Sequence, residues 1–308
     1  MSTSAQAQAA QRVAVSRYAR QVRLFPWLLM APTILYLLLL TVFPLLYSLW
    51  ISLFEVVLGR PSGFVGLGNY AAILRDPAFW QALQTTGIIT LVAVGVELAL
   101  GLVFALVLNK RLPGMGVFQL IIYLPMMVSP LVMGYFWRFM LDGSFGVINW
   151  ALGLFGLGPY YWLNEPRLAL ASIIMVDVWQ WTPFVVLLVL AGLHTVPPQL
   201  YEAATLDRAS PWMQFRRITL PYLKTPILLA LLFRTIDTIK IFDSIYIMTG
   251  GGPGDYTQSL SVLAFREGYN YSHTGKAAAL SWLMVIVINI LATILIKMLT
   301  DRRRNERM

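Results

Sequence analysis

The chain has 308 residues, of which 58% are hydrophobic and only 12% charged, and it contains no cysteine. Soluble domains carry about a quarter charged residues, so this composition excludes an ordinary soluble protein and indicates one that lies in the lipid bilayer. Without cysteine, the chain can form neither a disulfide framework nor a thiolate metal site. Nucleic-acid binding is the competing explanation for the net charge of +9, but the basic residues are dispersed through loops with no soluble domain to present them.

Six apolar runs are each long enough to cross roughly 30 Å of hydrocarbon as a helix. They predict an all-α, polytopic membrane protein with six transmembrane helices near residues 27–54, 85–108, 116–141, 168–193, 226–247 and 277–300. The first run lacks a small-residue cleavage site, so we expect an uncleaved anchor and not a removed signal peptide. We divide the chain into an N-terminal segment 1–24, a transmembrane domain 25–300 and a basic tail 301–308.

The basic residues outside the predicted spans fall unequally on the two sides of the membrane. If the N-terminus lies in the cytoplasm, fifteen lysine and arginine residues lie on that side and five on the other. This distribution follows the positive-inside rule, so we predict that both termini are cytoplasmic. Topology then accounts for the net charge without a nucleic-acid partner.

A charge-bearing segment, residues 195–224, separates the fourth and fifth predicted spans. Apolar residues recur at helical spacing from Leu200 to Leu206, and Ser210 with Pro211 predicts the start of a second helix. A helix, a break and a helix on the cytoplasmic surface favour docking of a soluble protein. The alternative is that the segment packs against the spans of its own chain.

Polar side chains also lie within the fourth predicted span. A charged side chain at the bilayer centre costs about 3 kcal/mol on insertion scales, so such residues usually face the bundle interior or a watery path. Asp177 lies beside Trp179, Gln180 and Trp181. This mixture of carboxylate, amide and indole groups suits the hydroxyls and flat apolar faces of a sugar.

The fifth predicted span carries Arg234, Asp237 and Lys240 at a spacing of three, so Asp237 can neutralise either cation along one helix face. A structural ion-pair ladder and a solute-lining role are equally favoured. Asp243 lies near the outer end of this span, either as a rim or gate group or as an ordinary helix-end residue. Glu97 is isolated in its own span, which favours a structural role.

The sequence contains no site that supplies energy or catalysis. Residues 268–277 include glycine and lysine, but the spacing of a phosphate loop is wrong, and Ala277 stands where a hydroxyl residue would bind magnesium. Neither His194 nor His273 has a second ligand at metal spacing. We therefore expect no catalytic residue, no metal site and no cofactor in this chain, and we do not expect it to be an enzyme.

Four separated stretches resemble the permease subunits of binding-protein-dependent ABC importers, in the branch that includes maltose- and trehalose-type sugar permeases. They are EAATLDRA with the run from Phe215 to Pro221 after it, FVGLGNY at 64–70, VDVWQWTPF at 176–184 and FDSIYIMTGGGPGDYT at 242–257. The resemblance implies the type I ABC importer permease fold in the cytoplasmic (inner) membrane of a bacterium or archaeon. It also implies that the cytoplasmic EAA loop, within 195–224, couples to an ATPase through Glu202, Ala203, Ala204, Asp207, Ala209, Phe215, Leu220 and Pro221.

The same resemblance implies the partners and the solute. They are a second permease subunit in a heterodimer, two ATPase subunits that bind ATP and magnesium, and an extracytoplasmic binding protein that delivers solute to loops 55–84, 142–167 and 250–275. Such permeases import sugars by alternating access, so we expect a di- or oligosaccharide as the solute. We expect it to contact Asp177, Trp179, Gln180, Trp181, Asp237, Lys240 and Asp243, unless the partner permease alone holds it.

One residue departs from the family pattern. Arg208 stands where the family usually has glycine, so it must adopt an ordinary φ or accept strain of about 1–3 kcal/mol.

Three other functions remain open. Arg234 and Lys240 could meet the phosphate of a phosphorylated polyol such as glycerol phosphate, Asp177 and Asp237 could serve a stand-alone ion-coupled transporter, and a membrane scaffold or receptor would transport nothing.

Overall fold

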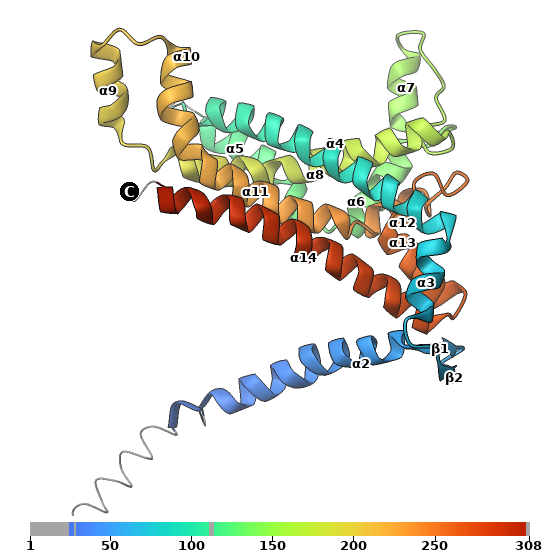
Figure 1. Cartoon of the computed structure of the whole chain (residues 1–308). Coiled ribbons are helices and arrows are strands. Elements are labelled where there is room, and N and C mark those ends of the chain that lie inside the picture. The colour runs from blue at the N-terminus through green and yellow to red at the C-terminus, as the bar shows by residue number, and fades with distance from the viewer. Residues whose placement is uncertain (1–24, 28, 111–113, 306–308) are drawn as a thin grey trace, which may run out of the picture.

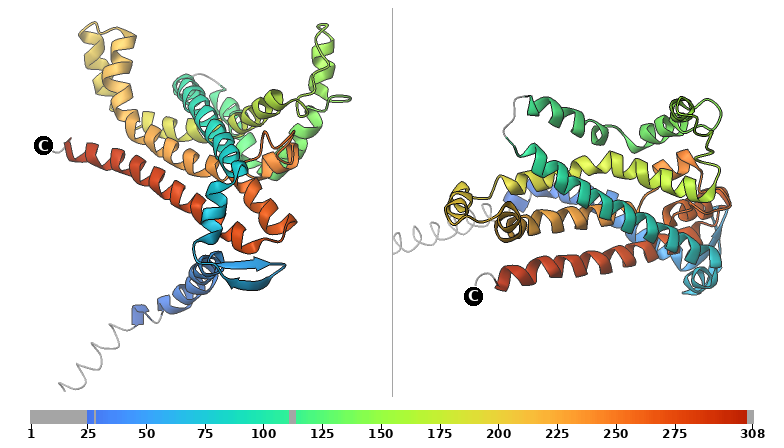
Figure 2. Two further views of the ribbon diagram at one scale, coloured as in Figure 1. Left: turned by 45° about the vertical axis from the view of Figure 1, so that its right-hand side comes forward. Right: turned by 90° about the horizontal axis from the view of Figure 1, so that it is seen from above.

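The computed structural model describes residues 25–27, 29–110 and 114–305 and shows an elongated bundle of helices (Figure 1). The predicted N-terminal segment 1–24 lies outside these residues. One end of the bundle carries α9 (Pro198–Leu206), α10 (Pro211–Gln214) and the C-terminal end of α14 (Thr274–Asn305), and the other carries α7 (Val147–Gly153) and a β-hairpin (Figures 1 and 2). Because α14 continues to Asn305, the helix extends into the predicted tail.

Three long helices form the centre of the bundle: α4 (Pro77–Leu108), α8 (Pro166–Leu193) and α11 (Leu220–Ile239). Helices α4 and α8 each begin with proline, where the missing N–H costs nothing because the first N–H groups of a helix have no partner within it. At the start of α4, the Asp76 carboxylate accepts a hydrogen bond from the backbone nitrogen of Ala78 at 3.0 Å. The helix therefore begins eight residues before the predicted span.

Four helices in the described part of the chain are long and apolar enough to cross a membrane: Leu29–Ser52, Pro77–Leu108, Pro166–Leu193 and Thr274–Met298. They correspond to the first, second, fourth and sixth predicted spans. The third predicted span is divided into α5 (Met115–Tyr123), η2 (Pro125–Met127) and α6 (Pro130–Met140), because proline cannot donate a backbone hydrogen bond. The fifth is divided between α11 and α12 (Asp243–Met248), so the count of six spans stays a prediction.

The first helix leans away from the others and joins the bundle at its C-terminal end (Figure 1). It includes η1 (Leu38–Val42) and α2 (Phe43–Ser52), and 0% of its most apolar stretch is buried. Trp282 Nε1 of α14 donates to Ser48 Oγ at 3.1 Å, and Asn69 Nδ2 donates to the Ser52 carbonyl at 2.8 Å. The chain then forms the antiparallel strands β1 (Phe54–Val57) and β2 (Arg60–Phe64), followed by α3 (Gly68–Arg75).

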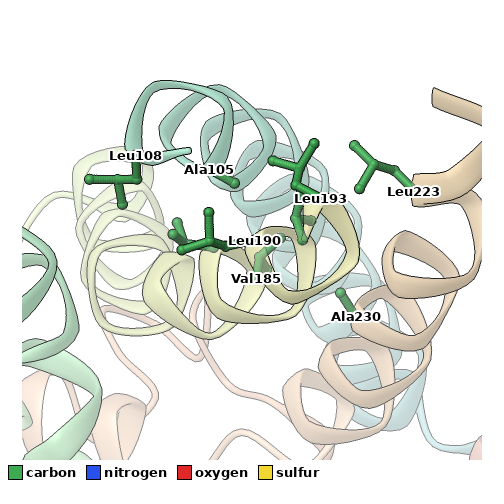
Figure 3. Packing of buried hydrophobic residues seen from close by; sticks show 9 residues of the cluster. Ala105, Leu108, Val185, Leu190, Leu193, Leu223 and Ala230 are labelled. Carbon is green, nitrogen blue, oxygen red and sulfur yellow. The ribbon is translucent and has the colours of Figure 1, made fainter. Parts of the chain in front are cut away.

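Two hydrophobic clusters lie along α8. The cluster nearer α9 packs α8 between α4 and α11 (Figure 3) and consists of Ala105, Leu108, Val185, Val186, Val189, Leu190, Leu193, Leu223 and Ala230. The other packs the first half of α8 near α12 and consists of Ile89, Leu141, Ile173, Val176, Ile241, Ile245, Met248 and Val262. Pro183 lies inside α8 between its residues of the two clusters.

A third cluster joins the ends of α3 and α4 to α13 (Leu260–Phe265) and α14. It consists of Ile73, Phe79, Ala82, Leu260, Leu263, Ala279, Leu280 and Met284. A short π-helical turn, η4 (Arg266–Asn270), follows α13. This cluster fixes the outermost turns of the long helices relative to the loop that precedes α14.

Candidate functional site

A buried ionic cluster lies where α4, α8 and α11 meet. Arg234 Nε donates to Glu97 Oε2 at 2.6 Å, and Arg234 Nη2 donates to Glu97 Oε1 at 2.9 Å and to Asp177 Oδ2 at 2.8 Å. Arg234 Nη1 donates to Asp237 Oδ2 at 2.7 Å. The side chains of Arg234 and Glu97 are only 2% and 0% exposed. One arginine thus binds three carboxylates, which come from three helices.

The planar shape of the guanidinium explains this arrangement. Its donors point outward in a rigid fork that matches carboxylate geometry, and it stays charged at any physiological pH. The centre of the Arg234 guanidinium also lies 4.9 Å from the centroid of the Trp181 ring, in position for a cation–π interaction. Asp237 is 49% exposed, so the cluster reaches from the protein interior to an open surface.

Next to this cluster is a small polar cavity of about 100 Å³. Its lining includes six of the seven predicted solute residues, namely Asp177, Gln180, Trp181, Asp237, Lys240 and Asp243. Pro130, Thr238, Ile241, Phe242 and Ser244 complete it. The structure therefore brings together carboxylates of three helices, an amide, an ammonium and an indole around one space.

A second cavity of about 350 Å³ adjoins the first, since both are lined by Trp181, Asp237 and Lys240. Its remaining lining residues are Phe184, Phe233, Arg234 and Ile236. The rings of Phe184 and Phe233 meet edge to face with centroids 6.2 Å apart. Together the two cavities offer a polar wall and an aromatic wall, which is the combination that a ring with hydroxyl groups requires.

Trp179 is the predicted solute residue that the structure separates from the others. Its ring lies 5.3 Å from that of Trp137 in a T-shaped contact, and it lines a different, largely apolar cavity of about 700 Å³ between α4, α5 and α8. On a helix, residues one or two positions apart point in different directions, whereas residues three or four apart share a face. Asp177, Gln180 and Trp181 share a face, and Trp179 lies off it.

Sequence reasoning missed the partner of Glu97. A carboxylate in an apolar helix needs a compensating group, but this group lies 137 positions away along the chain. Of the two cations that Asp237 was predicted to neutralise, it pairs with Arg234. Lys240 forms no ion pair among the described residues. The described part of the chain also holds no group of three or more histidine, aspartate or glutamate side chains placed to share a metal ion.

The segment predicted to dock a soluble protein forms two short helices that project beyond the bundle (Figures 1 and 2). Helix α9 ends at Leu206, and α10 begins at Pro211 with the Ser210 hydroxyl accepting from the Met213 nitrogen at 3.3 Å. Large apolar side chains are exposed on this segment, including Leu206 at 86% and Trp212 at 67%. Helix α10, the π-helical turn η3 (Phe215–Thr219) and α11 follow without a break, so one continuous helix joins the segment to Arg234.

The predicted coupling residues divide into two groups. Glu202, Ala203 and Asp207 are exposed on or next to α9, and Ala204 and Ala209 are half-buried at the turn. Phe215, Leu220 and Pro221 lie on the continuous helix, where Phe215 stacks on Trp212 with centroids 5.6 Å apart. The Tyr201 and Thr219 hydroxyls lie 2.8 Å apart, which holds the two groups together.

Arg208 adopts the strained alternative. Its φ is +57°, in the left-handed region that glycine enters freely. The Arg208 nitrogen donates to the Thr205 carbonyl at 3.0 Å, and the Ala209 nitrogen donates to the Ala204 carbonyl at 2.9 Å, so the turn closes as a glycine turn would. The turn thus has the backbone geometry that glycine favours, with an exposed arginine at its apex.

The three predicted delivery loops lie together at the opposite end of the bundle (Figure 1). Arg266 binds the Asp255 carboxylate, and its Nη2 donates to the Gly250 carbonyl at 2.7 Å. Lys276 Nζ donates to Glu267 at 2.9 Å and to Asp76 at 3.2 Å, which links the loop before α14 to the start of α4. These bonds connect loop 250–275 to loop 55–84.

Comparison with known proteins gives consistent matches. Residues 97–305 match the family described as binding-protein-dependent transport system inner membrane component. The chain is 40% identical over 278 residues to the trehalose/maltose transport system permease protein MalF of Thermococcus litoralis, covering 90% of this chain and 94% of that one. It is 36% identical over 297 residues to the trehalose transport system permease protein SugA of Mycobacterium tuberculosis, covering 94% of each chain.

The fold is similar to that of a bacterial ABC transporter involved in the import of the acidic polysaccharide alginate. The TM-score is 0.81 at 23% sequence identity, with 94% of this chain and 98% of the other covered. The likeness supports the overall architecture over the 94% of the chain that it covers.

Proposed function

Because this chain belongs to the family of inner membrane components of binding-protein-dependent transport systems, we propose that it is a permease subunit of an ATP-driven importer for a di- or oligosaccharide. The observation that carries the proposal is the paired cavity around Trp181, where carboxylates, an amide and aromatic rings surround one space. Relatives named for trehalose and maltose cover most of the chain, which favours sugars of that size.

The charges of the cavity argue against a phosphorylated polyol. Such a solute would need a free arginine or lysine to bind its phosphate. Arg234 is 2% exposed and already binds three carboxylates. At the polar cavity this leaves Lys240 as the cation available to a phosphate, which the carboxylates of Asp237 and Asp243 would repel. A neutral solute with many hydroxyl groups avoids this repulsion and can donate hydrogen bonds to the carboxylates.

A stand-alone ion-coupled transporter would use Asp177 and Asp237 to bind protons or sodium ions. In this structure both carboxylates accept hydrogen bonds from Arg234, and the neighbouring segment of α9 and α10 presents an exposed surface suited to a separate motor protein. Both observations favour an importer whose ATPase lies on other chains.

We place both termini and the α9–α10 segment in the cytoplasm, with the delivery loops facing an extracytoplasmic binding protein. A second permease subunit would close the path, and two ATPase subunits would hold the α9–α10 segments. In this arrangement ATP-driven closure tilts α9 and α10, and the continuous helix carries the movement about 21 Å from Leu220 to Arg234, at 1.5 Å per residue. Rocking of packed helices then exposes the cavity to each side in turn.

The test is uptake into proteoliposomes that contain the complete importer with its binding protein. We expect ATP-dependent uptake of trehalose or maltose. Preferential uptake of glycerol phosphate, or uptake by this chain without the ATPases, would contradict the proposal.

Single substitutions then test the site itself. Trp181→Ala and Asp177→Ala should raise the KM for sugar about tenfold, as the loss of a buried binding contact does. Trp179→Ala removes the same ring from the other side of α8 and should change KM less than about twofold, because its ring is outside the cavity. Normal sugar uptake and normal sugar-stimulated ATP hydrolysis in both Trp181→Ala and Asp177→Ala would remove this site from consideration.

A further inference from the structure

Arg234 borders the second cavity, but its side chain is only 2% exposed and all three of its nitrogens already bind carboxylates. We propose that Arg234 is a positioning residue for the solute: it fixes Asp177, Trp181 and Asp237, which face the cavity, without itself serving as the solute's ligand. The inference rests on the proposed function and deepens it, since it assigns part of the affinity for the solute to a buried guanidinium that orients the cavity-lining side chains.

The first step is the geometry of the guanidinium. All three of its nitrogens donate to carboxylates at 2.6–2.9 Å, and the group is almost completely buried. An arginine fork held by four such bonds has one orientation, because the bonds are charge-assisted and their directions are fixed by the planar group. The groups that it holds therefore share that single orientation.

The second step concerns the two aspartates. Each accepts from Arg234 through Oδ2, and both line the polar cavity. A carboxylate has two oxygens and about four lone-pair sites, so the bond to Arg234 orients the group and leaves capacity to accept from hydroxyl groups. Without Arg234 these two carboxylates, together with that of Glu97, would repel one another in a region of low dielectric.

The third step concerns the indole. The guanidinium lies over one face of the Trp181 ring, and the same ring lines both cavities. A cation–π contact on one face fixes the plane of the ring and leaves the opposite face for a second flat group. The pyranose ring of a sugar is a group of that kind.

Glu97 makes the proposal testable, because it lines neither of the two cavities and still forms two hydrogen bonds with Arg234. Its hydrogen-bond partner is Arg234, so we expect its main effect on the solute to pass through that side chain. Glu97→Gln keeps the size of the side chain and removes its charge, and Arg234→Lys keeps the charge and removes the planar fork. Neither substitution alters a group that binds the sugar in this proposal.

The experiment measures KM and kcat for disaccharide uptake by the reconstituted importer, normalised to folded permease in the membrane. We expect Arg234→Lys to raise KM about tenfold or more and Glu97→Gln to raise it about threefold, with smaller changes in kcat, since charged hydrogen bonds are lost or weakened. Arg138→Lys is the matched control, because Arg138 is exposed and donates to the Ile247 carbonyl outside the cavity, and it should leave KM unchanged.

A double-mutant cycle separates positioning from general stability. The effects of Glu97→Gln and Asp237→Asn on KM should be non-additive, because both residues bind the guanidinium of Arg234, and Asp237 in addition faces the cavity. If Arg234→Lys yields no folded protein, Glu97→Gln and this cycle decide the matter. Additive effects, or an unchanged KM in Arg234→Lys and Glu97→Gln while Trp181→Ala raises it, would overturn the positioning role and leave the proposed function intact. An unchanged KM in Trp181→Ala as well would overturn both.

Discussion

The ionic cluster of α4, α8 and α11 and the α9–α10 segment use charged and bulky side chains in opposite ways. In the cluster, buried charges are bound to one another within the chain, with N–O distances of 2.6–2.8 Å in its three ion pairs. On the α9–α10 segment, charged and large apolar side chains are exposed, as at Glu202 and Leu206. The first region binds its charges within the chain, whereas the second presents its side chains outward, as the proposed docking surface requires.

This contrast predicts which property each region controls. Substitutions in the cluster should change the stability of the permease and its affinity for solute. Substitutions on the segment should change transport while the folded permease remains in the membrane. The following four measurements test that division, from the largest expected effect to the smallest.

The largest effect is expected for Glu97→Ala. The substitution removes a carboxylate that binds a buried arginine, and breaking a buried pair in this way typically costs about 3–5 kcal/mol. We expect a clear fall in the melting temperature of the detergent-solubilised permease, measured by size-exclusion chromatography after heating. Glu165→Ala removes an exposed carboxylate that forms no cap hydrogen bond, and it should have an effect within about 0.5 kcal/mol. Equal melting temperatures for both variants would contradict the central role of the cluster.

Ala203→Trp tests the other region. Ala203 is exposed on α9, so the larger side chain does not disturb the permease itself, but it would prevent close docking. We expect about a thirtyfold loss of transport, the effect of a lost interface contact worth roughly 2 kcal/mol. Folding and insertion should be normal. Ala203→Ser, the small-residue control at the same position, should retain transport, and full coupling of ATP hydrolysis to uptake in Ala203→Trp would argue against docking here.

Gly101→Ala tests how tightly the membrane region is packed. A Cβ atom at Gly101 of α4 would lie 2.5 Å from Val185 Cγ1 of α8, so one helix must move. We expect a loss of about 1–3 kcal/mol in stability, the usual cost of overpacking. Gly95→Ala on the same helix meets no atom within 4 Å and should instead stabilise it by about 0.5–1 kcal/mol. Thermal denaturation of both variants checks this. A higher melting temperature in both would show that α4 and α8 are loosely packed at Gly101.

The smallest effect is expected for Arg208→Gly. Glycine adopts a φ of +57° without strain, so the variant should gain about 1 kcal/mol in stability. Asp207, its neighbour, has an ordinary φ of −74°, and Asp207→Gly should cost up to about 0.5 kcal/mol through lost chain entropy. Thermal denaturation of the two variants gives the answer. Destabilisation by both substitutions would mean that the arginine side chain itself holds the turn.

Much of the fold could be predicted because bilayer-length apolar runs have few alternatives. The predicted span at 168–193 corresponds to α8 within two residues. Helix α4 begins earlier than its predicted span because Asp76 and Pro77 start a helix through a more polar stretch that hydrophobicity alone passes over. The third run is divided because Pro125 and Pro130 interrupt it, which its hydrophobicity does not reveal.

The site could be predicted only in part. Intramembrane polar residues pointed to helices that the structure brings together around one cavity, because a polar group at this depth requires a compensating partner. Trp179 shows the limit of reading neighbours in sequence as neighbours in space, since it lies off the face shared by Asp177 and Trp181. The pairing of Glu97 with Arg234 depends on how two distant helices pack, and one sequence holds no record of that contact.

Pro183 marks a point where α8 can bend close to the cavity. A proline inside a helix has no N–H to offer the carbonyl four residues earlier, so α8 can bend at this point without breaking a backbone hydrogen bond. Because the proline lies between the α8 residues of two hydrophobic clusters, a bend here changes the angle between the halves of α8 that pack in each cluster. The cavity that we propose for the sugar is lined by Gln180 and Trp181, within one turn of Pro183, so the flexible point of α8 and this cavity are neighbours.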